Sequence, residues 1–183
     1  MAAFVIHLAD LTDTGEKAYV FPITREWLAE ALDDTEYDPP EAGRVPGGFE
    51  VTGREVGDDV LADGRIHATL RVPCARCNEA IDWRIDLRFT QLFVSRGSCE
   101  EQHGDEELEL TPEDLERETY VGEEIVLDAL VRENLILEVP MTPRCPGGCA
   151  DPRIAAYLDR ADEKKPGPLA GLLDLKDKLG ESS

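Results

Sequence analysis

Two stretches of strictly alternating residues constrain this sequence more than any other feature. Every second residue is apolar in 65–72, and the same pattern returns in 81–89. Because successive side chains of a β-strand point to opposite faces, each stretch predicts a strand with one buried face. Only a short polar segment separates them, so we expect an antiparallel hairpin.

Details of this hairpin also follow from the pattern. An earlier strand around 49–61 is expected to enter it through a turn at Asp63-Gly64, a dipeptide typical of tight turns. After Phe89 the alternation shifts by one residue, with Gln91 at an expected apolar position. Since such a shift would turn every later side chain to the other face, we expect a β-bulge near Thr90 and Gln91.

The remaining elements are shorter. An apolar run predicts a strand within 2–9, and helical spacing predicts helices over 24–32, with Thr24 as N-cap, and over 127–137 before Pro140. Prolines and glycines predict a loop over 38–48. We expect a helical turn at 112–116 and a short strand at 119–121. Leucines at helical spacing predict a C-terminal amphipathic helix over 169–179. The expected fold is α+β, a mainly antiparallel sheet or small open barrel with a few flanking helices.

Length and composition fit a single folded domain. The chain has 183 residues and is 42% hydrophobic, which suits a globular protein with its own core. We expect one domain over 1–163, followed by a linker and the C-terminal helix over 164–183. No run of residues is long and apolar enough to span a membrane, and the N-terminus lacks a signal-peptide pattern, so we expect a cytoplasmic protein.

The charge is strongly negative. With 19 basic and 40 acidic residues the formal net charge is −21, and 12 acids against one basic residue fall within 100–124. Such a surface repels phosphate backbones, which disfavours extensive direct binding of nucleic acid, and it attracts basic partners. A simple role in keeping the protein in solution is the alternative reading.

Four cysteines form two close pairs. Cys74-Ala-Arg-Cys77 lies between the two strand patterns, and Cys145-Pro-Gly-Gly-Cys149 follows after 67 residues in a segment rich in proline and glycine. Two cysteine pairs on turns supply the four soft ligands that tetrahedral zinc prefers, and both spacings fall within the usual range. The sequence therefore predicts a structural metal site, with zinc as the expected ion.

Other uses of these cysteines remain open. A disulfide framework is disfavoured in a cytoplasmic chain with a full core. A thioredoxin-like redox pair would lie between a strand and a helix, whereas both flanks of the first pair are strands. Unbound thiols that sense oxidation remain a third reading, and the cysteine runs of iron-sulfur proteins are denser than these.

No set of residues predicts a catalytic centre. Cys99 and His103 resemble a ligand pair but read better as bystanders, and neither His7 nor His67 has a recognisable partner. The chain lacks a phosphate-binding glycine loop, a nucleophile elbow and a zinc-protease motif. We therefore expect neither an enzyme nor a small-molecule substrate.

The order of these motifs resembles the YceD family, the large ribosomal RNA subunit accumulation proteins. The resemblance spans about 45–180. Cys74, Arg76 and Cys77 match the family's Cys-x-Arg-Cys, and Glu133 with Pro140 matches the end of its helix. The stretch from Leu130 to Pro140, Pro-Arg-Cys at 143–145 and the closing segment 168–176 follow in the family's order. The chain departs from many members in lacking a Gly-Leu-Cys-Pro-x-Cys-Gly stretch after Cys145.

The resemblance implies a function that composition alone does not. Members are non-enzymatic factors needed for accumulation of the large-subunit ribosomal RNA. Combined with the acidic surface, it leads us to expect a basic ribosomal protein or a pre-ribosomal particle as partner. The alternatives are an RNA-binding module that uses the metal site with Arg65, Arg71, Arg76, Arg84 and Arg88, and a redox-regulated thiol protein.

Overall fold

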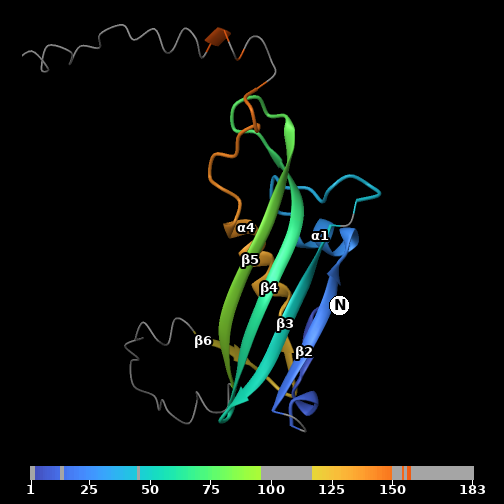
Figure 1. Ribbon diagram of the computed structural model, residues 1–183, viewed down its shortest axis with the longest axis vertical. Coiled ribbons are helices and arrows are strands. Elements are labelled where there is room, and N and C mark those ends of the chain that lie inside the picture. Colours follow the sequence, from blue (N-terminus) through green and yellow to red (C-terminus); the bar gives the residue numbers. More distant parts are fainter. Residues whose placement is uncertain are drawn as a thin grey trace, which may run out of the picture.

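The structure is a computed structural model, and it describes residues 3–12, 15–44, 46–95, 117–149, 154 and 156–157. A long hairpin of β4 (Asp59–Pro73) and β5 (Ala80–Ser95) runs along its long axis (Figure 1). The two strands pair without interruption from Val60 opposite Phe93 to Pro73 opposite Ala80. The predicted hairpin is thus confirmed, and it is longer than the alternating pattern alone indicates.

The hairpin is the centre of a five-stranded sheet with the order β2-β3-β4-β5-β6. Strands β2 (Glu16–Ile23) and β3 (Gly47–Val56) extend it antiparallel on the β4 side. Strand β6 (Arg117–Tyr120) pairs parallel to the end of β5. A separate two-stranded sheet joins β1 (Val5–His7) to β7 (Glu124–Val126), and a short 3-10 helix, Leu8–Asp10, follows β1. The predicted α+β class with a mainly antiparallel sheet is confirmed.

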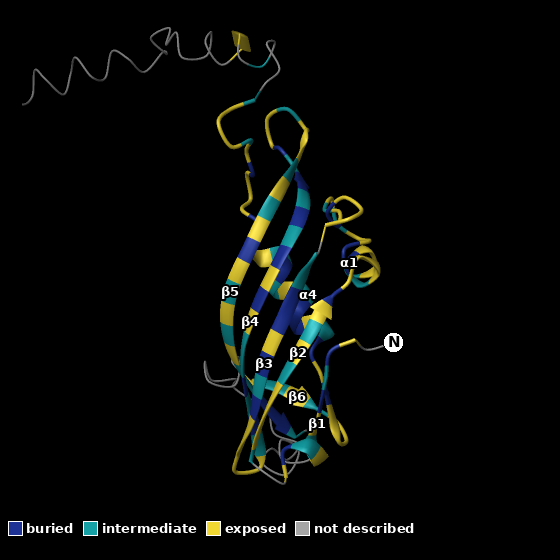
Figure 2. Cartoon of the chain, turned by 45° about the vertical axis from the view of Figure 1, so that its right-hand side comes forward, coloured by how far each residue is buried: buried dark blue, intermediate teal, exposed yellow. Residues whose placement is uncertain are grey.

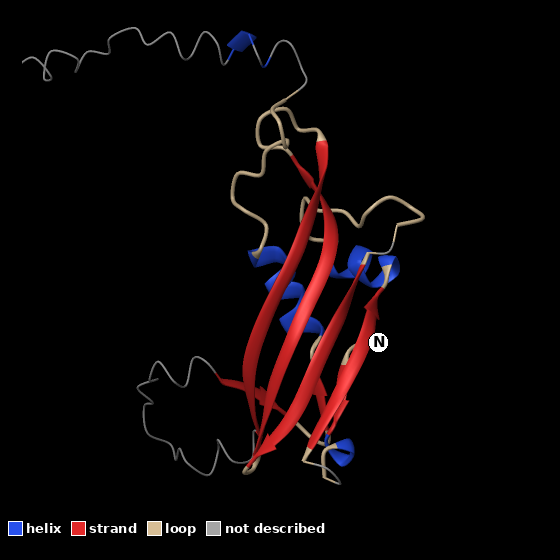
Figure 3. Ribbon diagram, in the orientation of Figure 1, coloured by secondary structure: helices blue, strands red, loops and turns tan. Residues whose placement is uncertain are grey.

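Two helices cover one face of the large sheet (Figure 3). Helix α1 (Arg25–Ala31) begins where predicted, with the Thr24 hydroxyl accepting a hydrogen bond from the Trp27 backbone N–H as an N-cap. Helix α4 (Asp128–Leu137) buries Leu130, Val131 and Leu135. These side chains pack with alternate residues of the strands, which gives β4 its banded burial in Figure 2. Phe49 lies fully buried among the rings of Phe4, Phe21 and Phe89.

Two predictions within the sheet are wrong. The chain turns at Gly57 and Asp58, between β3 and β4, and Asp63-Gly64 lies inside β4. Gly64 is there for packing, because a Cβ at this position would lie 2.5 Å from the Phe89 ring and 2.7 Å from the Glu50 carbonyl oxygen. Aspartate and glycine together therefore mimicked a turn signal.

The predicted β-bulge is also wrong. Thr90 pairs with Asp63 and Gln91 with Ala62 in the same register as the rest of the hairpin. Gln91 keeps its place on the inward face, half-buried, and Val94 is buried on the opposite face. Apolar residues thus occupy both faces at this end of β5. In the sequence this looks like a one-residue shift of the alternating pattern, although the strand contains no bulge.

The other short predictions agree broadly with the structure. The strand predicted within 2–9 is β1, and that at 119–121 corresponds to β6. Within the predicted loop 38–48, Gly47 and Gly48 already belong to β3, and Asp38 forms an isolated bridge with Arg71. The predicted helical turn at 112–116 and the linker and helix at 164–183 lie outside the described residues, and the division into 1–163 and 164–183 stays a prediction.

Candidate metal centre

The first cysteine pair is held by the turn that joins β4 to β5. Cys74 directly follows β4, and its backbone N–H donates to the Glu79 carbonyl at 2.9 Å, while the Asn78 N–H donates to the Cys74 carbonyl at 2.9 Å. Asn78 adopts a left-handed conformation with φ of 61°, which asparagine tolerates better than most residues. This closed turn, 74–79, brings Cys74 and Cys77 to the end of the hairpin.

The second pair lies on the segment that follows α4. This segment, 140–149, rises from the helix to the end of the hairpin (Figure 1). The Ala75 backbone N–H donates to the Pro143 carbonyl at 2.8 Å, which ties the segment to the turn. Gly147 and Gly148 both have positive φ, 85° and 99°, so the chain can reverse between Cys145 and Cys149. Together, 74–79 and 140–149 form what we call the hairpin tip.

The tip brings all four predicted cysteines into one cluster. Their sulfur atoms lie within 4.8 Å of one another, although the two pairs are far apart in the sequence. The Cys74 and Cys149 sulfurs are 3.8 Å apart, and those of Cys77 and Cys145 are 3.5 Å apart. Four thiolates bound tetrahedrally to zinc, each at about 2.3 Å, would lie about 3.8 Å from one another. The cluster therefore has the dimensions of a tetrahedral sulfur site.

The surroundings shift the pKa of Cys74 and those of Cys145 and Cys149 in opposite directions. Backbone N–H groups of Cys77 and Arg76 hydrogen-bond to Cys74 and lower the pKa of its thiol to about 6. The hydrogen bond with the Cys77 sulfur raises the pKa of Cys145 to about 12. Burial is the largest cause that raises the pKa of Cys149. Cys74 is thus a thiolate at neutral pH, and a bound cation would have to displace the protons of Cys145 and Cys149.

The donor set suits a structural ion better than a catalytic one. Four sulfur ligands complete a tetrahedral shell and leave no position for water or substrate. Cys74 is 2% exposed, and the other three cysteines are half-buried. Such a site could join the hairpin to the segment after α4, and its chemistry fits zinc and other thiolate-binding ions.

The remaining candidate residues do not join this cluster. His7 forms an ion pair with Glu124 at 3.3 Å on the small sheet, and the imidazole of His67 packs over Gly48, where a Cβ would lie 2.6 Å from its Cε1. Cys99 and His103 lie outside the described residues. Among the described residues, the four cysteines are the one group arranged to hold a metal ion.

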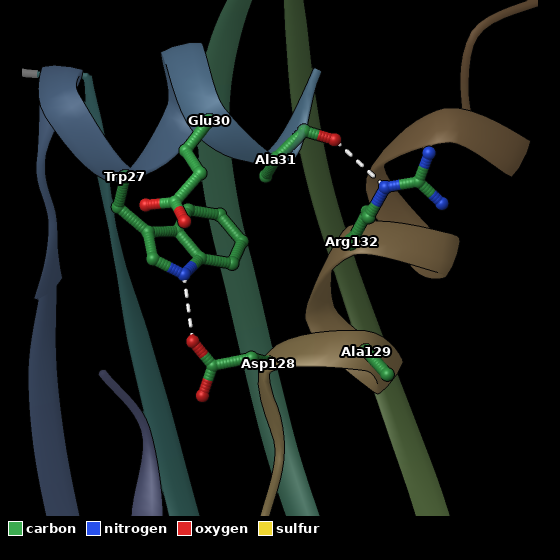
Figure 4. Close-up of a pocket in the computed structure, with 6 residues that line it drawn as sticks. All are labelled: Trp27, Glu30, Ala31, Asp128, Ala129 and Arg132. Atoms are coloured by element: carbon green, nitrogen blue, oxygen red, sulfur yellow. Dashed lines mark hydrogen bonds between the residues drawn. The ribbon is translucent and has the colours of Figure 1, made fainter. Parts of the chain in front are cut away.

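Sequence reasoning missed a polar clasp between the two helices. The Asp128 carboxylate accepts hydrogen bonds from the backbone N–H groups of Ala3 and Phe4 and from the Trp27 indole at 2.8 Å. Arg132 donates to the Ala31 carbonyl and pairs with Asp34. Trp27, Asp128 and Arg132, drawn in Figure 4, line a hollow between α1 and α4 with a volume of about 190 Å³. Because contacts within the chain occupy Asp128 and Arg132, we interpret the hollow as structural.

The outward face of the sheet carries arginines, as the alternating pattern indicates. Several are already paired: Arg65 makes two hydrogen bonds to Asp86, at 2.7 and 2.6 Å, and Arg71 lies 3.6 Å from Glu41. The hydrogen bond from Arg65 also lowers the pKa of Asp86. Mixed charge on this face therefore offers phosphates much less than a continuous basic surface would.

Comparison with known proteins identifies a matching family. The family model for the large ribosomal RNA subunit accumulation protein YceD matches residues 62–176, which is more than half of the chain. The matched segment includes both cysteine pairs, β5 and α4. No curated protein and no solved structure matches the chain. None of the described helices is both long and apolar enough to cross a membrane.

Proposed function

This chain belongs to the YceD family, and from that membership we propose that it is a non-enzymatic factor in the accumulation of the large-subunit ribosomal RNA. The family model supports this role directly, and it is the observation that carries the proposal. The closed set of four thiols supports the absence of a catalytic task for this site, because nothing in its shell is left for a substrate.

We propose that the cysteine cluster binds one zinc ion as a structural clip. The sulfur spacings of 3.5 and 3.8 Å support this, as does the hydrogen bond from Ala75 to Pro143 that aligns the two halves of the tip. Metal binding to such a site contributes to folding, since the unfolded chain does not present four converging thiols. The clip would fix the end of the hairpin to the segment after α4.

The proposed partner is a basic ribosomal protein or a pre-ribosomal particle, contacted through the acidic surface. The net charge of −21 supports a cationic partner, because opposite charges speed encounter and exclude wrong partners. Pull-down from a lysate of cells that contain the tagged chain, with and without a chelator, tests this proposal. Recovery of large-subunit components is expected, and recovery of no ribosomal component would contradict it.

A measurement in cells tests the role itself. Removing the chain is expected to lower the amount of large-subunit ribosomal RNA relative to small-subunit RNA, and re-expression is expected to restore it. A matched re-expression of the Cys77→Ser and Cys145→Ser variants would show whether the proposed clip is needed. An unchanged ratio after removal would contradict the proposed function.

An RNA-binding module is the second candidate, favoured by the arginines of the outward sheet face and by Arg76, exposed at the tip. A salt titration separates the two functions. Binding to isolated ribosomal RNA that weakens steeply with salt would favour the module, because each phosphate contact releases counterions. Binding that requires a ribosomal protein favours our proposal. A redox-regulated thiol protein would instead be isolated without metal and with reversible disulfides.

A further inference from the structure

Within the described part of the chain, most of the outer edge of β5 pairs with no other strand. Strand β6 pairs only with Leu92–Ser95, so among the described strands none pairs with Ala80–Thr90 on the side away from β4. Figure 3 shows this edge along the outside of the sheet. A long, regular edge presents unpaired backbone N–H and C=O groups and is a template for another strand. Natural sheets shorten, cover or distort such edges unless they are used.

Acidic and basic side chains alternate along this edge, and the order of their charges reverses about Ile85. On the outward face, β5 presents Asp82, Arg84, Asp86 and Arg88 in that order. If a second copy pairs antiparallel about Ile85, Asp82 lies opposite Arg88 of the other copy and Arg84 lies opposite Asp86. All four cross-strand pairs then join opposite charges, which stabilises an antiparallel pair. Asp82 and Asp86 already pair with Arg44 and Arg65 within one copy, so in the dimer each carboxylate would lie between two arginines. Parallel pairing in register would instead place each charge opposite its own copy.

The charge pattern also restricts the register in which the two strands can pair. Moving the centre of the pairing to Asp86 places Arg84 opposite Arg88, and moving it to Arg84 places Asp82 opposite Asp86. Like charges directly opposite each other destabilise a strand pair. Centres at Trp83 or Leu87 bring only two opposite-charge pairs together, whereas the register centred on Ile85 brings four and relates the two copies by a two-fold axis.

The inward face of the same edge supports this pairing. Pairing about Ile85 places Trp83 opposite Leu87 and Ile81 opposite Phe89 of the other copy. These four side chains are only partly buried within one copy, although they pack against its core. Aromatic and branched apolar pairs across strands add stability and would lose exposed surface on pairing.

We propose that two copies of this chain associate through the β5 edges, paired antiparallel about Ile85, and so join their two large sheets into one, with β6 of each copy beyond the end of the paired segment. The net charge of −21 on each copy opposes association, but at physiological ionic strength screening confines that repulsion to about 8 Å, whereas the edge pairs are in contact. The proposal goes beyond the proposed function and does not depend on the metal.

Oligomeric state tests the proposal. Light scattering after gel filtration, and native mass spectrometry, are expected to show a dimer of the full chain. Arg88→Glu places Glu opposite Asp82 of the other copy and is expected to weaken the dimer roughly tenfold or more. It is compatible with the fold of one copy, because Arg88 pairs with Arg65 across the hairpin. Arg54→Glu, with the same charge change on β3, is the matched control and should leave the dimer unchanged.

A mixing experiment tests the register. Arg84→Glu with Arg88→Glu gives an acidic edge, and Asp82→Lys with Asp86→Lys gives a basic edge, so each variant alone is expected to be monomeric. Mixed together, the two are expected to form a heterodimer, while circular dichroism checks that each is folded. A monomeric parent chain, a dimer that the edge variants leave intact, an equal loss in the Arg54→Glu control, or a mixture that stays monomeric would each overturn the proposal.

Discussion

The middle and the tip of the long hairpin are held together by different means. In the middle, Ile66 and Leu70 of β4 are fully buried against the helices, and an aromatic cluster centred on Phe49 fills the core. At the tip, beyond Val72, the buried side chains of the described residues are those of Cys74 and Pro143. Apolar burial therefore accounts for the middle of this pair of strands, whereas the tip has little apolar burial and instead gathers four thiols that could share one metal ion.

The largest effect is expected from a change in the middle. Phe49→Ala removes a fully buried ring and is expected to lower the free energy of unfolding by about 3–5 kcal/mol, through lost burial and a cavity. Urea denaturation followed by circular dichroism measures it. Val20→Ala, at a position 76% exposed on β2, is the control and should stay within about 0.5 kcal/mol. A loss below 1 kcal/mol for Phe49→Ala would contradict the described core.

A smaller effect is expected from the clasp between the helices. Asp128→Ala leaves the Trp27 indole and the Ala3 and Phe4 N–H groups without their acceptor. We expect a loss of about 1–3 kcal/mol, because unpaired donors keep their desolvation cost. Urea denaturation monitored by tryptophan fluorescence reports both the loss and the change around Trp27. If stability and fluorescence both stay unchanged, the clasp does not hold the helices.

Metal removal is expected to act on the tip and spare the middle. After treatment with a chelator, hydrogen exchange should speed up in peptides covering 74–79 and 140–149, because the thiols no longer bind a common metal ion. Peptides from β3 and from the middle of β4 should keep their protection. Cys77→Ser offers a control that removes one ligand without chelator. Equal loss of protection throughout the chain would erase the distinction between the two regions.

The smallest effect is expected from pH, and it should again be confined to the tip. In the metal-free cluster the pKa of Cys145 is raised to about 12 and that of Cys149 is also raised, so both thiols carry protons at neutral pH. Metal must displace these protons, and affinity is therefore expected to fall as pH falls, more steeply below about 6, where Cys74 also takes up a proton.

Competition with a chromophoric chelator across this range measures the affinity. The middle of the hairpin is the internal control, since no polar or charged residue is buried among the described residues. Its unfolding free energy should change little over the same range. An affinity independent of pH would contradict binding through the thiols.

The sequence predicted the middle of the hairpin well because its alternation is a direct consequence of strand geometry. It placed Thr24 and the helix before Pro140 correctly for the same kind of local reason. The turn predicted at Gly64 is wrong because this glycine makes room for the ring of Phe89, a residue far along the chain. The bulge predicted at Gln91 is wrong because tertiary neighbours decide which face of β5 is buried near its end.

The cysteine cluster shows the same division. The spacing within each cysteine pair indicates a metal-binding turn. That the two turns lie together follows from the preference of zinc for four soft ligands. The Asp128 clasp was not readable, because a lone aspartate at the start of a helix carries no sign of an indole 101 residues away. Local chemistry was thus visible in the sequence, whereas contacts between distant segments required the fold.

We propose that one metal ion bound to Cys74, Cys77, Cys145 and Cys149 closes the hairpin tip. Native mass spectrometry of the chain, purified without added metal or chelator, tests it most directly when combined with elemental analysis. One zinc ion for each chain is expected, with all four thiols bound and the ion lost from Cys77→Ser and Cys145→Ser. A chain isolated without metal that takes up none when zinc is supplied, or whose cysteines form disulfides reversibly instead, would contradict the claim.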